Sequence, residues 1–382
     1  MRMVVLGGGL QGSACAYDLL QDPAITRVTL ADIDIERLAP FLAPYRQDAR
    51  LELRRLDARD EGEVSEALRG ASSCMNALPY YFNLRMAQLA VEAGAHYSDL
   101  GGNTAIVRQQ LQLDAAARRR GVSVIPDCGL APGMVNILAQ AGIDALDEVR
   151  TVRIVVGGLP QRPEPPLNYQ VVYSLHGVLD YYTTPSWVLR DGQPTQVEAL
   201  SEVEPVDFPP PVGRLEAFHT AGGLSTMADT YRGRIPTMEY KTLRYPGHAE
   251  IMRAIRGLGL LDLEPVLVDG RPVRPRDAFI ACAEPRLSRP DSEDLVALRV
   301  VAEGTEDGAP ARVAFELLDR YDPATGISAM ERTTGFSLAI TGVMQARGQV
   351  RGAGALTPDQ AVPAGPYIAA LAQRGIRIER SA

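Results

Sequence analysis

The chain has 382 residues and a formal net charge of −8, with 46% hydrophobic and 23% charged residues. This composition is typical of a soluble globular protein of about two domains, and the acidic balance argues against a nucleic-acid-binding protein. The four cysteines lie far apart and form no CxxC pair. Neither a metal site nor a disulfide framework is therefore indicated.

The N-terminal stretch MRMVVLGGGLQGSA enters a strand directly and lacks the layout of a signal peptide. No apolar run is long enough to cross a bilayer. We therefore expect a cytoplasmic protein that binds neither nucleic acid nor membrane.

Short apolar runs alternate with helical patterns over the first 126 residues. The predicted strands are 2–6, 28–31, 51–56, 73–77, 97–100 and 122–125, and the predicted helices are 12–21, 35–43, 61–68, 83–93 and 105–120. This alternation is typical of an α/β fold with a doubly wound parallel sheet. Residues 1–126 are therefore predicted to form an N-terminal Rossmann domain.

The pattern changes after Pro126. Strand-like runs occupy 150–175 and 295–320, and the second region should form a hairpin around the polar turn GTEDGAP. Residues 127–345 are predicted to be a second, α+β domain that binds substrate. Its last helix, 329–345, is apolar enough to lie in the core or a subunit interface, and a tail over 346–382 contains a further helix at 365–373.

The first strand is followed by Gly7-Gly8-Gly9-Leu10-Gln11-Gly12, which matches G-x-G-x-x-G between a strand and a helix. Gly7 permits a tight turn, Gly9 lets the backbone approach a pyrophosphate, and Gly12 allows close packing of the helix on the strand. The amides of Leu10 and Gln11 then face the phosphate charge at the helix start. The motif predicts dinucleotide binding.

Asp32 ends the second predicted strand 20 residues beyond Gly12. A carboxylate there accepts hydrogen bonds from ribose hydroxyls and repels a 2′-phosphate, which favours NAD over NADP. Asp57 follows the third strand and either lies near the adenine edge or is a solvated turn carboxylate.

Ligands of a Rossmann sheet sit at the carboxyl ends of its strands. Asn76, Ala77, Leu78 and Pro79 follow the fourth strand there and are predicted to shape the nicotinamide pocket. Asp99 and Asp127 follow the next two strands and are candidate catalytic carboxylates beside the reacting amine; the alternative for both is a helix cap or a turn.

Several long motifs resemble the saccharopine dehydrogenase-like family: NALPYYFN at 76–83, AGAHYSDLGG at 93–102 and GVSVIPDCGLAPGMVN at 121–136. Three more, YSLHGVLDYYTTPSWVLRDG at 173–192, FHTAGGLST at 218–226 and EYKTLRYPGH at 239–248, resemble its lysine 6-dehydrogenase branch. The resemblance implies NAD-dependent oxidative deamination of the ε-amine of L-lysine to the 6-semialdehyde, which cyclises, with release of ammonia. It also implies a tail that returns to the Rossmann domain and a homodimer or homotetramer.

The second domain supplies basic candidates. Lys241 is the only lysine among 39 basic residues, which suggests that an ammonium is needed there. Lys241 is a candidate base, and Arg244 three residues later could grip a carboxylate. His176 is a candidate proton carrier, and substrate contacts are expected from His219, Thr220, Tyr245 and His248; a structural role is the alternative for each.

Two other functions stay open. A saccharopine or carboxynorspermidine dehydrogenase would use the same scaffold but needs more converging basic groups, and Arg162, Arg190, Arg232 and Arg234 are available. A non-catalytic NAD sensor would need the glycine turn without a polar cleft.

Overall fold

The computed structural model describes residues 1–36, 38–289 and 292–381. Within these ranges, the N-terminal sheet has seven parallel strands in the order β17-β6-β5-β4-β1-β2-β3. The predicted α/β fold with a Rossmann sheet is confirmed. The strands are β1 (Arg2–Leu6), β2 (Arg27–Asp32), β3 (Leu51–Arg55), β4 (Ser73–Asn76), β5 (His96–Asp99), β6 (Ser123–Ile125) and β17 (Gly354–Ala355).

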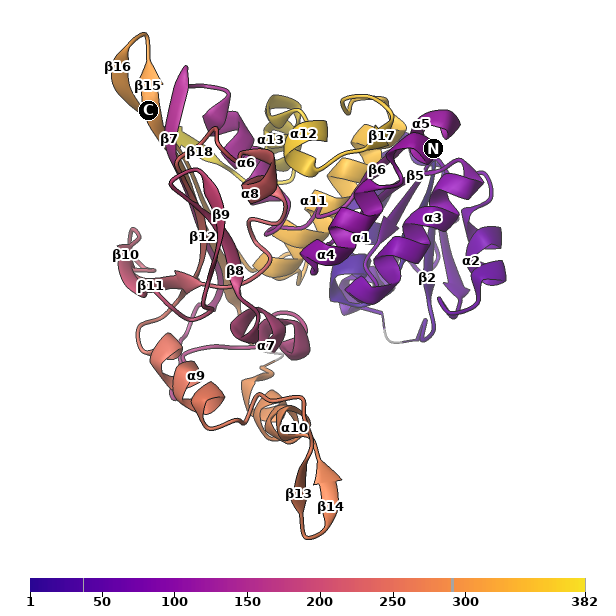
Figure 1. Cartoon of the computed structure of the whole chain (residues 1–382). Coiled ribbons are helices and arrows are strands. Elements are labelled where there is room, and N and C mark those ends of the chain that lie inside the picture. Colours follow the sequence, from indigo (N-terminus) through magenta and orange to yellow (C-terminus); the bar gives the residue numbers. More distant parts are fainter. Residues whose placement is uncertain (37, 290–291, 382) are drawn as a thin grey trace.

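Helices cover both faces of this sheet (Figure 1). They are α1 (Leu10–Leu20), α2 (Glu61–Leu68), α3 (Asn83–Ala93), α4 (Thr104–Leu111) and α5 (Asp114–Arg120), with a short 3-10 helix η2 (Tyr80–Phe82) before α3. Apolar side chains of α1 pack on one face of the sheet and those of α2 and α3 on the other. Most of α1 is buried, because it also packs against α11 (Ala329–Ala346).

Two helix predictions in this domain are wrong. Residues 35–43 do not form an α-helix: the described part contains a turn and a 3-10 helix, η1 (Pro40–Tyr45), because Pro40 and Pro44 cannot continue an α-helical ladder. Arg37 lies outside the described residues. The single helix predicted over 105–120 is broken into α4 and α5, and Asp114 at the break accepts a hydrogen bond from the amide of Ala355 in β17, 3.1 Å away.

The second sheet has nine strands among the described residues. Its main order is β10-β11-β12-β7-β15-β16-β18, and β8 pairs with β12 and β9. The strands are β7 (Glu148–Pro160), β8 (Ser186–Arg190), β9 (Gln193–Val197), β10 (Glu204–Asp207), β11 (Arg214–His219), β12 (Thr237–Arg244), β15 (Asp294–Glu306), β16 (Ala309–Arg320) and β18 (Glu379–Ser381). The predicted hairpin is confirmed as β15 and β16.

The helices after β6 are α6 (Met134–Ile143), α7 (Leu175–Thr183), α8 (Met227–Thr230), α9 (His248–Gly257), α10 (Pro275–Leu287), α11 (Ala329–Ala346), α12 (Pro358–Ala361) and α13 (Ala364–Gln373). A small separate hairpin, β13 (Val266–Val268) with β14 (Arg271–Val273), lies between α9 and α10. The predicted apolar helix is α11, and it is a core helix: it lies between the two sheets and contacts α1, β4, β5, β15 and β16 (Figure 1).

The tail after α11 joins both sheets, since β17 pairs with β6 and β18 pairs with β16. One continuous apolar cluster runs from β1 and α1 through α11 to β7 and β15. The two halves of the molecule therefore share a core. The exact domain limits predicted at 126 and 345 stay predictions.

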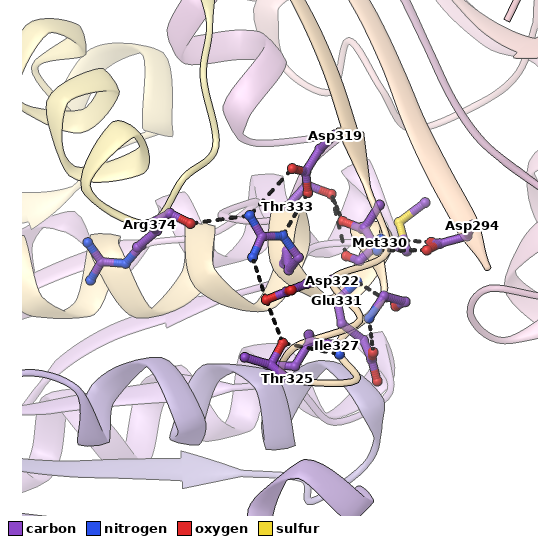
Figure 2. A network of polar contacts seen from close by, with 12 residues as sticks. Asp294, Asp319, Asp322, Thr325, Ile327, Met330, Glu331, Thr333 and Arg374 are labelled. Atoms are coloured by element: carbon purple, nitrogen blue, oxygen red, sulfur yellow. Dashed lines mark hydrogen bonds and ion pairs between the residues drawn. The ribbon is translucent and has the colours of Figure 1, made fainter. Parts of the chain in front are cut away.

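A polar network holds the N-terminus of α11 (Figure 2). The carboxylate of Asp294 on β15 accepts hydrogen bonds from the amides of Ala329 and Met330 at 2.7 and 2.9 Å, which pairs two otherwise unsatisfied N–H groups of the helix start. Arg332, one turn along α11, pairs with Asp319 of β16 and donates to the carbonyl of Arg374 in the tail.

Within the described ranges, no helix combines the length and the apolar character needed to cross a membrane.

Candidate active site

The glycine turn has the geometry of a dinucleotide site. Gly7 has φ +94°, and a Cβ there would lie 2.9 Å from the carbonyl carbon of Ala77. A Cβ on Gly12 would lie 1.8 Å from the carbonyl oxygen of Gly7, whereas nothing lies within 4 Å of the Cβ position of Gly9. Gly7 and Gly12 are thus needed for packing, and Gly9 keeps the approach to the start of α1 open.

A cavity of about 770 Å³ opens beside this turn, between the two halves of the molecule. Leu10 and Tyr17 line it from α1, and Gln170, Val171 and Tyr321 line it from the opposite side. Both polar atoms of the Gln11 side chain are buried with no hydrogen-bond partner among the described residues. The open turn and the unsatisfied amide of Gln11 fit a bound dinucleotide, and Leu10 is the residue of the glycine motif that lines the cavity.

Asp32, at the end of β2, and Asp57, after β3, differ in their contacts. The carboxylate of Asp32 accepts a hydrogen bond from the amide of Gly8 at 2.6 Å, so it stands against the glycine turn where a ribose would lie. Asp57 is exposed and pairs with Arg59 at 2.6 Å, and this hydrogen-bonded guanidinium lowers the pKa of Asp57 to about 2. The carboxylate of Asp57 is therefore already paired with Arg59, two residues along the chain.

The end of β4 is organised by internal hydrogen bonds. The side-chain nitrogen of Asn76 donates to Asn83 and to the hydroxyl of Tyr97, and its oxygen accepts from the amide of Leu78. Asn76 thus fixes the loop rather than facing a ligand. Ala77, Leu78 and Pro79 follow it at the carboxyl edge of the sheet, and Ala77 packs against Gly7.

Asp99 is held inside the Rossmann domain. It is fully buried, and its carboxylate accepts hydrogen bonds from the amides of Gly101 and Asp127 and from the side chain of Gln110. Burial raises its pKa. The catalytic role predicted for Asp99 finds no support in this geometry, because its hydrogen bonds hold together the ends of β5 and β6 and the side chain of Gln110 on α4.

Asp127 is the carboxyl group that meets the second domain. It is only 2% exposed, and its carboxylate accepts a hydrogen bond from the hydroxyl of Ser225, in the loop between β11 and α8. Burial raises the pKa of Asp127 to about 8. The nearby charges of Asp99 and Asp359 also raise this pKa, whereas the hydrogen bond from Ser225 lowers it. Both partners are backbone outliers, with φ 62° for Asp127 and 49° for Ser225, and strain of this kind concentrates at functional sites.

Close approach shapes the surroundings of Asp127. A Cβ on Gly101 would lie 1.9 Å from its Oδ1, so only glycine fits there. Across the cleft, a Cβ on Gly223 would lie 2.3 Å from the ring of Tyr240, and Tyr181 packs against Gly222. The glycines of the family-like motif thus bring aromatic side chains of the second domain towards the carboxyl edge of the Rossmann sheet.

A second contact closes this edge from the side. Arg108 of α4 pairs with Asp229 of α8 at 2.7 Å, and its guanidinium lies 5.9 Å from the ring centre of Trp187. Sequence reasoning missed Ser225, Arg108 and Asp229 as site-forming residues. Of the three, only Ser225 lies in a motif singled out from the sequence, FHTAGGLST.

Arg244 is a buried cation on the cleft-facing side of the second sheet. Its Nε donates to the hydroxyl of Tyr182 at 3.2 Å, its Nη1 donates to the carbonyl of Leu243, and it lies 4.8 Å from the ring centre of Tyr169. Among the described residues, no carboxylate forms an ion pair with Arg244. A buried guanidinium without a counter-ion is costly, and such a group suits an anionic ligand.

His248 belongs to the same cluster but is a structural residue. Its Nδ1 lies 3.0 Å from the carbonyl of Leu167 and therefore carries the hydrogen, which leaves Nε2 to accept from Tyr182 at 2.9 Å. Burial, with the charge of Arg244, lowers its pKa to about 3, so it stays neutral. Thr220 shares a hydrogen bond with Thr242 of β12 at 2.7 Å, on the side of Tyr240 and the cleft.

Lys241 and His219 lie on the opposite face of the second sheet. Side chains alternate along a strand, so Lys241 and Arg244, three apart on β12, cannot point the same way. Lys241 pairs directly across β11 and β12 with His219, and its ammonium binds Glu204 at 2.9 Å. The prediction that Lys241 and His219 serve the cleft is wrong for this reason.

These two residues belong to a closed charge network on the outer face. Arg153 pairs with Glu204 and Glu239, and Arg190 pairs with Glu202 and Glu239. Lys241 pairs with Glu204, and His219 contacts Glu202. Ligand-type atoms of Glu202, His219 and Glu239 lie within 4.8 Å of one another. Arg190 already bridges the two carboxylates, so the network carries its own cation.

The last two candidates are peripheral. His176 is exposed on the first turn of α7. Tyr245 donates its hydroxyl hydrogen to the carbonyl of Pro160 at 3.0 Å and so holds the end of β7.

Two protein-family models match the chain. The model of the saccharopine dehydrogenase NADP binding domain matches residues 3–125, and that of the saccharopine dehydrogenase C-terminal domain matches residues 129–376.

Two curated relatives are similar over much of the chain. Mitochondrial alpha-aminoadipic semialdehyde synthase of Mus musculus is 26% identical over 54% of the chain and 23% of its own length. Saccharopine dehydrogenase [NADP(+), L-glutamate-forming] of Pyricularia oryzae is 23% identical over 69% of the chain and 58% of its own length. The chain thus spans less than two thirds of either protein.

Two solved structures share the fold. The apo saccharopine dehydrogenase (L-Glu forming) of Saccharomyces cerevisiae has a TM-score of 0.81 at 19% identity and covers 100% of this chain and 99% of its own. Homospermidine synthase of Legionella pneumophila, solved in complex with NAD, has a TM-score of 0.70 at 11% identity, over 100% of this chain and 91% of its own.

Proposed function

We propose, since the chain belongs to the saccharopine dehydrogenase family of oxidoreductases, that it catalyses the NAD-dependent oxidative deamination of the ε-amine of L-lysine. The carbon next to the amine would lose a hydride and the nitrogen a proton. Water would then add to the resulting imine, and ammonia would leave to give the 6-semialdehyde. The alternative on the same scaffold is a saccharopine or carboxynorspermidine dehydrogenase.

One observation carries the proposal: a strained, buried carboxyl group at the carboxyl edge of a dinucleotide-type sheet contacts the opposite domain. That group is Asp127, with its pKa raised to about 8 and its hydrogen bond to Ser225. Perturbed carboxyl groups in such clefts are typical of general acid–base catalysts. A sensor that only binds a dinucleotide has no need of one.

Asp127 would supply the proton chemistry. An ε-ammonium has an ordinary pKa near 10.4 and must lose a proton before its nitrogen can assist hydride loss. Asp127 would take that proton in its ionised form and return it when water adds to the imine and ammonia leaves. Nicotinamide, when bound against the open glycine turn, supplies the hydride acceptor.

Arg244 supports an amino-acid substrate with one carboxylate. Within the part of the chain that the structure describes, Arg244 is buried on the cleft-facing side without a carboxylate partner, and a guanidinium can bind an α-carboxylate through two hydrogen bonds. Two of the other candidate cations, Lys241 and Arg190, bind glutamates on the outer face, and Arg232 lies 3.7 Å from Asp229. Lysine therefore ranks ahead of saccharopine, although the names of the family models and relatives favour saccharopine.

NAD ranks ahead of NADP for a charge reason. Asp32 stands against the glycine turn, where its negative charge would repel a 2′-phosphate. The matching family model is that of an NADP binding domain, so the preference for NAD rests on this carboxylate.

The decisive experiment is an NADH-absorbance assay of the purified full chain. NAD or NADP is offered with L-lysine, saccharopine, carboxynorspermidine, L-glutamate and diamines in turn. We expect reduction of NAD with L-lysine and formation of ammonia in equal amount. Reduction only with saccharopine or carboxynorspermidine would establish the alternative, and tight NAD binding with no turnover on any amine would establish a sensor.

A further inference from the structure

The cavity of about 770 Å³ beside the glycine turn has a negatively charged wall. Asp294 and Glu331 line it where β15 meets the start of α11, and they are only 1% and 6% exposed (Figure 2). In the described part of the chain, neither carboxylate forms an ion pair. The guanidinium of Arg332, the residue after Glu331, pairs with Asp319 at 3.0 Å and lies 3.7 Å from Asp322. The wall therefore holds buried negative charge without a counter-ion, which is costly.

Backbone amides stabilise the ionised form of both carboxylates. Asp294 accepts hydrogen bonds from the amides of Ala329 and Met330, and Glu331 accepts one from the amide of Ser328 at 2.8 Å. Burial raises the pKa of Asp294 to about 6, and its hydrogen bonds oppose the rise. Burial also raises the pKa of Glu331, and the charge of Asp294 adds to that rise. Asp294 is thus mostly ionised at neutral pH, and a cation against this wall would stabilise both charges.

Gln170 adds an unpaired hydrogen-bond acceptor to the same cavity. Its side chain is 4% exposed, and its Nε2 donates to the carbonyl of Ser292 at 3.3 Å, which fixes which end of the amide is left free. The free end is Oε1, which is buried and has no hydrogen-bond partner among the described residues. A buried acceptor without a donor is unfavourable, and a ligand with N–H groups would satisfy it.

The other side of the cavity is apolar and aromatic. The elements α1 and η1 contribute Leu10, Tyr17, Phe41 and Tyr45, and the second domain adds Val171. The ring of Tyr17 packs edge-on against Phe41 at 5.8 Å and against Tyr45 at 5.5 Å between ring centres. Aromatic rings attract cations and also pack against aliphatic chains. The volume lies within the range of small-molecule sites.

We propose that this cavity binds a primary aliphatic amine. The ammonium donates to Gln170, Asp294 and Glu331, and the carbon chain lies against the aromatic side. An anionic ligand is disfavoured, because Arg289, which also lines the cavity, already pairs with Glu164 at 2.8 Å. The bound amine then connects α1 with the second domain.

This cavity is separate from the cluster around the candidate catalytic carboxylate. Asp127 and Arg244 are not among the described residues that line it. Amine binding in the cavity therefore does not require the reaction proposed above.

Isothermal titration calorimetry of the full chain with n-pentylamine tests the site, with n-pentanol as the uncharged control. The wild type should bind the amine and not the alcohol. Asp294→Asn and Glu331→Gln keep acceptors for the amides but remove a charge, and each should raise the dissociation constant about tenfold. Gln170→Leu should raise it about fivefold. Glu303→Gln, on the same strand as Asp294, is the matched control and should change nothing.

A protection assay locates the bound amine without altering the charged wall. The thiol introduced by Val171→Cys lies in the cavity wall, whereas the native Cys282 is exposed on α10 and serves as the internal control. Added n-pentylamine should slow alkylation by iodoacetamide at position 171 and leave alkylation of Cys282 unchanged.

Asp127→Asn distinguishes the two sites and should bind n-pentylamine as the wild type does. Loss of binding in this variant would place the amine at the candidate active site and overturn the proposal, whatever the NADH assay shows. No amine binding, equal binding of n-pentanol, affinities indifferent to Asp294→Asn and Glu331→Gln, or no protection at position 171 would also overturn it.

Discussion

Asp127 combines backbone strain, burial and a contact between domains in one residue. The sequence places it after a strand of the Rossmann sheet, but only the fold gives it Ser225 as a partner and Gly101 as a close neighbour. A carboxyl group with a pKa of about 8 is mostly protonated at neutral pH. Its charge state therefore changes within the range in which activity can be measured.

Replacing Asp127 by Asn tests its role as a base. For the wild type we expect kcat/KM to rise with pH and level off above about pH 8, since the ionised form accepts the proton. Asp127→Asn should lose this dependence and about 100-fold or more in rate. A variant with an unchanged pH profile would leave Asp127 a purely structural residue.

The same substitution has an expected effect on stability. Between an ordinary pKa near 4 and the folded value of about 8, the unfolded chain releases a proton that the folded chain keeps. The free energy of unfolding of the wild type should therefore fall as pH rises through this window. Denaturant titrations at several pH values should show a smaller fall for Asp127→Asn.

Asp32 sets the expected choice of cofactor. Asp32→Ala removes an acceptor of two ribose hydroxyls, and we expect NAD to bind about tenfold or more weakly while NADP changes little. Isothermal titration calorimetry with each dinucleotide measures both affinities. Asp32→Asn is the matched control, because it keeps an acceptor for the amide of Gly8 but not the charge. Unchanged NAD affinity in both variants would contradict the assigned role.

At the scale of elements, β12 divides its side chains between two environments. Tyr240, Thr242 and Arg244 face the cleft, whereas Lys241 and Glu239 face the outer charge network. The sequence motif EYKTLRYPGH shows these residues side by side, and alternation along the strand separates them. The retained lysine is thus an ion-pair residue.

Lys241→Met should lower stability and leave catalysis intact. Loss of the ammonium leaves Glu204 with fewer partners on a half-buried face, at an expected cost of about 1–3 kcal/mol in the free energy of unfolding, with kcat/KM within about twofold. Chemical denaturation and the NADH assay measure the two quantities. Arg214→Met, which breaks an exposed pair with Asp207, is the matched control and should cost little. A large fall in kcat without loss of stability would contradict this prediction and support a catalytic role for Lys241.

At the scale of the whole molecule, the C-terminal tail connects the two sheets. Arg374 binds the buried carboxylate of Asp18 on α1 through two nitrogens, at 2.6 and 2.8 Å. Its own carbonyl accepts from Arg332 of α11, which in turn pairs with Asp319 of β16 (Figure 2). These pairs link the Rossmann domain to the second sheet behind the cleft.

Breaking this link should destabilise the fold as a unit. Arg374→Met leaves Asp18 buried without its partner, and we expect a loss of about 3 kcal/mol, the lower end of the range for buried pairs because Arg374 is partly exposed. The double variant Asp18→Asn with Arg374→Met should recover most of it, as measured by denaturant unfolding. Equal losses in the single and double variants would show that the pair itself contributes nothing.

Sequence patterns were enough to predict six strands of the Rossmann sheet and the position of the dinucleotide turn. Local patterns suffice there, because strand and helix periods, the glycine spacing and the acid after β2 all act over short stretches of chain. The same holds for the hairpin of β15 and β16, whose polar turn joins two apolar runs.

Which polar residues come together at the carboxyl edge of the Rossmann sheet depends on contacts between distant parts of the chain. Asp99, Asn76 and His248 form hydrogen bonds with Asp127, Tyr97 and Tyr182, which lie 28, 21 and 66 residues away. Lys241 and His219 lie on the far face of a sheet whose register no local pattern reveals. Ser225 reaches Asp127 across 98 residues of sequence. The physical reason is that burial and pairing depend on long-range packing, whereas residue type and spacing report only on the local chain.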